Sequence, residues 1–164
     1  MSSSNEKRTR GGKYLTFALG KEGYGLEILK VREIIGYMDI TAVPRMPSHV
    51  KGVINLRGQV ISVIDLRAKF GMETQEKTDE TCIIVVDISQ SGRKLNVGIV
   101  VDKVSEVLNI SEDAIESPPT FGAAVDTNFI LGMGKINNTV KILLDIDKVL
   151  GGDAALDASL AQAA

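Results

Sequence analysis

An internal repeat constrains the fold of this 164-residue chain more than any other feature of its sequence. The segment YGLEILKVREII (Tyr24–Ile35) aligns without gaps on VGIVVDKVSEVL (Val97–Leu108), 73 positions further along the chain. The segment Gly52–Gly71 aligns in the same way on Gly132–Gly151, 80 positions further along. Because the two blocks recur in the same order and pair several glycines, the sequence predicts a duplicated module of about seventy residues.

Most of each copy has the pattern of short β-strands. In KYLTFAL the apolar residues Leu15, Phe17 and Leu19 alternate with the side chains of the opposite face, and TCIIVVDI is rich in β-branched residues. Asn137-Asn138 is typical of a tight hairpin turn. The helical signals are short, and the sequence predicts helix caps at Asp65 and Asp145.

These elements predict a mainly β protein built from two small barrels of about five strands each, packed together with short helices. The predicted folded region is 13–151, with one subdomain at 14–71 and a second at 82–151. Neither copy is large enough to be very stable alone, so the two should form one unit. The Ser-, Lys- and Arg-rich segment 1–12 is expected to be a disordered arm, and the Ala-rich segment 152–164 a flexible or weakly helical tail.

No set of residues in the sequence predicts catalysis, a metal site or a cofactor. His49 is the only histidine, and it has no cysteine or carboxylate partner at the spacing of metal ligands. Cys82 opens an apolar strand and is interpreted as a small buried residue. The glycines form neither a phosphate-binding loop nor a dinucleotide-binding pattern. We therefore expect a protein that is not an enzyme.

Composition also argues against binding to nucleic acid or membrane. The net charge is −2, aromatic residues make up only 4%, and tryptophan is absent, whereas single-stranded nucleic acid is bound by a basic groove with aromatic platforms. No apolar run is long enough to span a bilayer, and the single cysteine excludes an internal disulfide. These features predict a cytoplasmic protein without direct membrane insertion.

What remains is a protein that works through its surfaces. Val31 and Ile34 in the first copy match Val104 and Val107 in the second, in segments that also carry Glu33 and Glu106. Core packing accounts for most of these apolar residues, but some of them could line a seam that receives a partner helix. Spacing alone does not decide whether Arg57 pairs with Glu33.

Three ordered motifs carry a resemblance to a known family. They are YGLEILKVREIIGY, then VPRMPSHVKGVINLRGQVISVIDLRAKFG, then VGIVVDKVSEVLNI, and the similarity runs from about Tyr14 to Leu150. This combination resembles the CheW family of bacterial chemotaxis coupling proteins. The resemblance implies two five-stranded SH3-like barrels and an adaptor that joins the CheA histidine kinase to the cytoplasmic tips of chemoreceptors, recruited to membrane-associated receptor arrays.

The resemblance also implies where the partners bind. The receptor tip would be bound by Val31, Glu33, Arg57, Val104 and Val107. The regulatory domain of the kinase would be contacted by turns at the barrel end near Gly52 and Gly58. The chain has no phosphotransfer histidine helix, nucleotide-binding segment or receiver domain, which predicts a stand-alone coupling protein.

Three alternatives stay open at this point. A coupling protein of a related, non-flagellar chemosensory array would have the same sequence features. From other classes, the alternatives are a small-barrel binder of single-stranded nucleic acid and, more remotely, a cysteine enzyme. In favour of the leading hypothesis, Arg57 is replaced by Asn137 in the second copy, so the module does not need arginine there and Arg57 is available for a partner.

Overall fold

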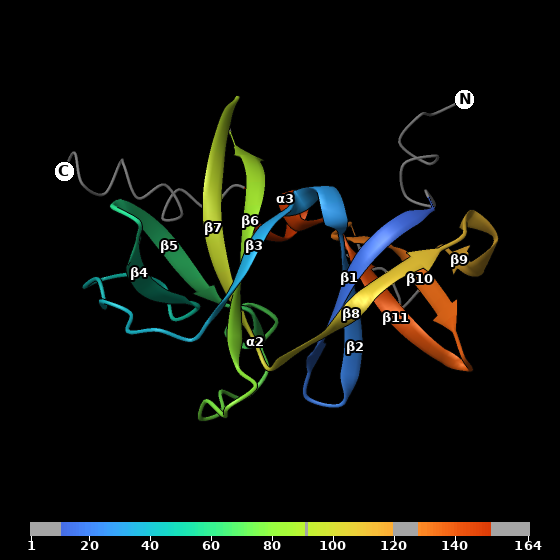
Figure 1. Cartoon of the computed structure of the whole chain (residues 1–164), viewed down its shortest axis with the longest axis horizontal. Coiled ribbons are helices and arrows are strands. Elements are labelled where there is room, and N and C mark those ends of the chain that lie inside the picture. The colour runs from blue at the N-terminus through green and yellow to red at the C-terminus, as the bar shows by residue number, and fades with distance from the viewer. Residues whose placement is uncertain (1–10, 91, 120–127, 152–164) are drawn as a thin grey trace.

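The computed structural model describes residues 11–90, 92–119 and 128–151, and within them the chain is mainly β-structure in two sheets lying side by side (Figure 1). The six-stranded sheet has the order β8 (Lys103–Ile110), β1 (Gly12–Leu19), β2 (Glu22–Glu27), β11 (Thr139–Leu144), β10 (Ile130–Ile136), β9 (Ile115–Glu116). The five-stranded sheet has the order β3 (Val31–Gly36), β6 (Cys82–Gln90), β7 (Arg93–Val101), β5 (Gln59–Asp65), β4 (Val50–Leu56). Between the strands lie η1 (Ile28–Lys30), α2 (Leu66–Lys69), η2 (Glu112–Ala114) and α3 (Ile146–Leu150).

The predicted class, mainly β with short helices, is confirmed. The six-stranded sheet differs from the prediction of five strands by the two-residue strand β9, which pairs with β10. In the other sheet Thr41 takes this place, exchanging two backbone hydrogen bonds of 2.9 Å with Val53 of β4. In both sheets the chain thus curls back and covers part of an open edge.

The strand pairings repeat in the two sheets, which confirms the duplication. β1 pairs antiparallel with β8, and β6 pairs antiparallel with β3. β2 pairs parallel with β11, and β7 pairs parallel with β5. Irregular register recurs at matching places, between Val50 and Gly52 in one hairpin and between Ile130 and Gly132 in the other. The two sheets are therefore two copies of one pairing scheme.

The sheets do not follow the division of the chain into 14–71 and 82–151 that the sequence predicts. β1 and β2 of the first copy complete the sheet of β8, β10 and β11, while β6 and β7 of the second copy complete the sheet of β3, β4 and β5. Each copy has exchanged its first hairpin with the other. Sequence similarity identifies equivalent strands but does not say which copy supplies the partner of each strand, so the exchange was not predicted.

The exchange places one large apolar cluster between the two sheets. Its fully buried members come from both, and they include Phe17 and Leu26 of the six-stranded sheet and Ile64, Ile84 and Ile99 of the five-stranded sheet. Each such side chain contributes about 1.5–3 kcal/mol when it is removed from water. Separating the sheets would expose this whole central cluster, so the two copies form one folded unit. A smaller satellite cluster belongs to each sheet.

The predicted turns and caps are confirmed. Arg57 and Gly58 connect β4 to β5, Asn137 and Asn138 connect β10 to β11, and all four have positive φ, as a two-residue type I′ turn requires. Asp65 accepts a hydrogen bond from the backbone N–H of Arg67 (3.0 Å) at the start of α2. Asp145 accepts one from the backbone N–H of Lys148 (3.3 Å) at the start of α3.

The predictions made for the terminal segments are largely outside the described residues. Of the predicted arm 1–12 only Gly11 and Gly12 are described, and Gly12 already begins β1. The whole of the predicted tail 152–164 lies outside the described residues.

The two glycines of the β4–β5 hairpin should respond differently to substitution. A Cβ at Gly52 (φ 145°) would lie 2.0 Å from the carbonyl oxygen of Thr41, so Gly52→Ala must displace backbone and should lower the free energy of unfolding by about 3 kcal/mol. Gly58 (φ 86°) has open space around its Cα, and Asn138 occupies the equivalent position with a φ of 65°, so Gly58→Asn should cost only the strain of the positive φ, about 1 kcal/mol. Urea unfolding of both variants measures the difference, and equal losses would contradict this account of the hairpin.

Candidate protein-interaction surface

The apolar residues of the predicted receptor site lie on β3 and β8, which lead outward from the middle of the molecule on either side (Figure 1). Directly opposed residues of paired strands project to the same face, so the register locates their side chains. Val31 and Ile34 oppose Val86 and Ile84, and Val104 and Val107 oppose Phe17 and Leu15. All four opposing residues belong to the central cluster. We name the set Val31, Ile34, Val104 and Val107 the apolar seam.

The apolar seam continues the central cluster toward the surface. Val31 and Val104 are half-buried and pack against that cluster. Ile34 is 44% exposed and Val107 is 48% exposed, which makes them two of the four large apolar side chains that are exposed among the described residues. The fold therefore supplies two matched strands, each with one anchored valine and one exposed apolar residue.

Of the polar members of the predicted site, Glu33 lies on the other face of β3, and Arg57 reaches it from the turn between β4 and β5. Glu33 opposes Val85, which belongs to the satellite cluster of the five-stranded sheet. Nη2 of Arg57 donates a hydrogen bond to Oε1 of Glu33, and the ion pair is partly exposed, with 67% of the Arg57 side chain accessible. The structure thus brings Arg57 to Glu33, but this ion pair and the apolar seam lie on opposite faces of β3.

The backbone at Arg57 gives a reason to regard its side chain as functional. Its φ of 51° lies in the left-handed region, which costs a non-glycine residue free energy and which asparagine tolerates better than arginine. Asn137, its counterpart, has a φ of 49°. An arginine is thus the less favourable residue for this turn, and the contact with Glu33, or with a partner, is what distinguishes it.

The two predicted kinase-contact residues are not brought together. Gly52 lies at the start of β4 and is buried, while Gly58 lies in the exposed turn at the other end of the same strand. Gly52 is needed for the close approach of Thr41, so its role in the structure is to shape the backbone. At the turn, the backbone N–H of Gly58 donates to Oδ1 of Asn55 (2.8 Å), a contact that the sequence analysis did not anticipate.

Two further features were missed by the sequence analysis. Leu29, in η1, is 91% exposed, the highest value among the exposed large apolar residues of the described chain. The residue that aligns with Leu29 in the second copy is Asp102, which is not apolar and accepts hydrogen bonds from Arg67. The repeat alignment placed Leu29 opposite Asp102, and that mismatch was the signal that could have identified both.

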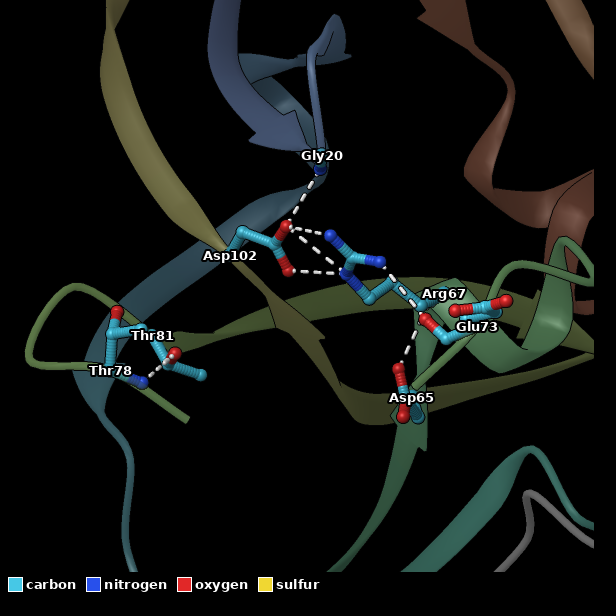
Figure 2. Close-up of polar contacts among 7 residues, drawn as sticks. All are labelled: Gly20, Asp65, Arg67, Glu73, Thr78, Thr81 and Asp102. Atoms are coloured by element: carbon cyan, nitrogen blue, oxygen red, sulfur yellow. Dashed lines mark hydrogen bonds and ion pairs between the residues drawn. The ribbon is translucent and has the colours of Figure 1, made fainter. Parts of the chain in front are cut away.

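Arg67 and Asp102 form a clamp at the point where the chain passes from β7 into β8 (Figure 2). Nε of Arg67 donates to both carboxylate oxygens of Asp102 (2.8 and 3.1 Å), and Nη2 donates to Oδ2 (2.6 Å). Oδ2 of Asp102 also accepts the backbone N–H of Gly20 (2.7 Å), and Nη1 of Arg67 donates to the carbonyl oxygen of Glu73 (2.9 Å). We name Arg67, Asp102 and Gly20 the Arg67 clamp.

Burial makes this clamp stronger than an ordinary surface ion pair. Arg67 is only 7% exposed, so its charge depends on Asp102 for compensation. The hydrogen bonds from Arg67 hold the pKa of the Asp102 carboxyl below its usual range, against the opposing effect of burial. Because the clamp joins α2, the β1–β2 turn and the start of β8, it connects elements of both sheets.

Cys82 and His49 are the two residues that were considered for chemistry. Burial raises the pKa of the Cys82 thiol, which disfavours the thiolate that a nucleophile or a metal site requires. The backbone carbonyl of His49 accepts a hydrogen bond from the backbone N–H of Asp65 (2.8 Å), a structural contact. Across the described ranges, no three His, Cys, Asp or Glu residues are grouped to hold a metal ion. No helix within these ranges is long and apolar enough to cross a membrane.

Comparison with known proteins identifies the family. The model of the CheW-like domain matches residues 13–153, which is nearly the whole described chain. The chain belongs to the CheW family. This agrees with the motifs of the sequence analysis and with the duplicated sheets.

Individual relatives cover the CheW-like chain almost completely. It is 40% identical over 145 residues to a chemotaxis protein CheW of Klebsiella aerogenes, covering 88% of this chain and 85% of that protein. It is 33% identical over 150 residues to a chemotaxis protein CheW of Rhizobium meliloti, covering 91% and 94%. Among solved structures, the scaffolding protein TtCheW of Thermoanaerobacter tengcongensis matches with a TM-score of 0.74 and 36% identity, covering 85% of this chain and 92% of that one.

The Arg67 clamp predicts a loss of stability in acid. Because the pKa of Asp102 is lowered in the folded chain, its contribution is complete above the unfolded value of about 3.9 and disappears as the pH falls through the lower folded value. Asp102→Asn should lower the free energy of unfolding by about 3 kcal/mol at neutral pH, because it leaves the buried Arg67 guanidinium without its counter-charge. Urea unfolding at a series of pH values should show this difference shrinking below about pH 4. A difference that is the same at every pH would contradict it.

Arg57→Asn should leave the fold intact. The variant recreates the turn residue found at Asn137, and the exposed ion pair that it removes contributes only about 0–1 kcal/mol. We expect the midpoint of thermal unfolding to stay within about 3 °C of the unmodified chain. A fall of ten degrees or so would mean that Arg57 is a structural residue.

Proposed function

We propose that this chain is a non-catalytic adaptor that couples chemoreceptors to the CheA histidine kinase in chemotaxis signal transduction. The observation that carries the proposal is the match of residues 13–153 to the CheW-like domain, together with relatives that are named chemotaxis and scaffolding proteins. On this proposal the protein is cytoplasmic and is recruited to membrane-associated receptor arrays. A non-flagellar chemosensory array would use the same surfaces.

The receptor partner is the helical hairpin at the cytoplasmic tip of a chemoreceptor. A helix that presents apolar residues on one face would bury them against the apolar seam, where Ile34 and Val107 are already accessible. Val31 and Val104 form the part of the seam that packs against the central cluster. Adding Ile34 to the predicted residues extends the surface along β3.

Glu33 and Arg57 would contribute orientation more than affinity. Charged groups at the rim of an interface mainly set the register of the partner and the rate of association. The Arg57 side chain is 67% exposed while one of its nitrogens is bound to Glu33, so its other N–H donors could bind a carboxylate of the receptor.

The kinase partner is the regulatory domain of CheA. Of the two predicted contacts, the exposed turn at Gly58 is accessible to a second protein, whereas Gly52 supports that hairpin from within. Gly58 and Arg57 form one turn, so a kinase bound there would lie beside the Arg57–Glu33 pair, whereas the apolar seam itself is on β3 and β8.

Titration of the full chain separately with a receptor-tip hairpin and with the kinase regulatory domain tests the proposal. Val107→Glu places a charge in the apolar seam and should weaken hairpin binding at least tenfold, about 1.4 kcal/mol, without affecting the kinase domain. Val140→Glu is the matched control, since Val140 is 53% exposed on β11, outside the seam. Binding of neither partner by the unmodified chain would overturn the proposed function, and equal effects of the two variants would overturn the assignment of the seam.

A further inference from the structure

Both strands of the apolar seam begin where the chain crosses from one sheet to the other. β2 of the six-stranded sheet leads through η1 into β3, and β7 of the five-stranded sheet leads through Asp102 into β8. The position of each seam strand therefore depends on what holds its crossover. At the second crossover this is the Arg67 clamp, reinforced by a hydrogen bond from the backbone N–H of Asp102 to the carbonyl oxygen of Ala18 (3.2 Å).

The first crossover has a clamp of the same design with its charges reversed. Nζ of Lys30, the residue before β3, lies 2.5 Å from Oδ2 of Asp147 in α3. Oδ1 of Asp147 accepts the backbone N–H of Ser89 (2.9 Å), as Asp102 accepts that of Gly20. Asp147 of α3 occupies the position that Arg67 of α2 holds in the first copy. The helix therefore supplies the anion at the first crossover and the cation at the second. We name Lys30, Asp147 and Ser89 the Lys30 clamp.

The two clamps differ in strength. In the Arg67 clamp the Arg67 side chain is 8% exposed and makes three hydrogen bonds to the carboxylate of Asp102, which is 29% exposed; the two clamps thus differ in the burial of the cation and not of the anion. In the Lys30 clamp a single ammonium contact joins side chains that are 32% and 29% exposed. Salt screens an accessible ion pair far more than a buried one, and a lysine contact lacks the geometric constraint of the arginine pair. The start of β8 is thus held rigidly and the start of β3 loosely.

We propose that Lys30 and Asp102 are positioning residues for the receptor surface, and that β3 is the adjustable strand of the seam while β8 is the fixed one. The proposal rests on the proposed function in one respect, that the seam binds the receptor hairpin. A hairpin that approaches the seam would be accommodated by movement of Val31 and Ile34 on β3, against a constant surface formed by Val104 and Val107.

Amide hydrogen exchange of the full chain tests the positioning without any partner. Raising the salt from about 0.05 to 1 M should speed amide exchange in β3 several-fold and in β8 much less. Exposed ion pairs also involve Arg32 and Glu33 of β3 and Lys103 of β8, so both strands have a background response to screening, and loss of the Lys30 clamp adds to that of β3. Lys30→Met keeps most of the aliphatic stem and should reduce the salt response of β3 to the background of its other ion pairs, with β3 already exchanging faster at low salt. Lys103→Met is the matched control, because Lys103 is the aligned lysine of the second copy and its ion pair with Glu80 is fully at the surface.

The outcomes separate the two proposals. Equal salt responses of β3 and β8, or the same behaviour of Lys30→Met and Lys103→Met, would overturn the assignment of β3 as the adjustable strand. If amide hydrogen exchange behaves as expected, Lys30→Met should change the affinity for a receptor-tip hairpin at least threefold and leave the affinity for the kinase regulatory domain unchanged. If the unmodified chain binds no hairpin, the proposed function fails while the clamp assignment stands. An unchanged hairpin affinity in Lys30→Met would overturn the link between the clamp and the receptor surface.

Discussion

The central apolar cluster is the constraint on which the other features of this protein depend. Because each copy of the module gives its first hairpin to the other sheet, the side chains between the sheets come from both ends of the chain. The seam strands β3 and β8 lie at the edge of this cluster, and their valines are anchored in it. The seam residues thus rest on the largest buried apolar cluster of the described chain.

The sequence was sufficient to predict the strands, turns and helix caps, but not which strands pair or which side chains meet in the fold. Alternating apolar residues, capping aspartates and the Asn137-Asn138 turn are local signals, and the structure has each of them. The exchange of hairpins and the contact of Arg57 with Glu33 depend on long-range pairing, and an internal sequence repeat carries no information about such pairing. Arg67 was hidden for another reason: it stands in a helical turn where a surface arginine is the ordinary expectation, and only the fold shows that it is buried.

Comparing the two copies separates scaffold from function more clearly than either copy alone. Positions that agree, such as Asp65 and Asp145, serve the hairpin and helix that both copies need. Positions that differ without a structural reason are the informative ones. Arg57 stands where Asn137 suits the turn better, and Leu29 is exposed where the second copy has a clamped aspartate.

The exchange of hairpins has a consequence for a single copy of the module. Such a chain would contain β2 and also β5, the equivalent of β11, so β2 could pair in parallel with β5 of its own chain or with the same strand of a second chain. The arrangement observed between the two copies corresponds to the second case, in which two chains trade hairpins with each other. The duplicated protein is thus a domain-swapped homodimer joined into one polypeptide, and the joining is what allows Arg57 and Asn137, or Leu29 and Asp102, to differ. A symmetric dimer would have two identical faces, whereas this chain can offer a different face to each of two partners.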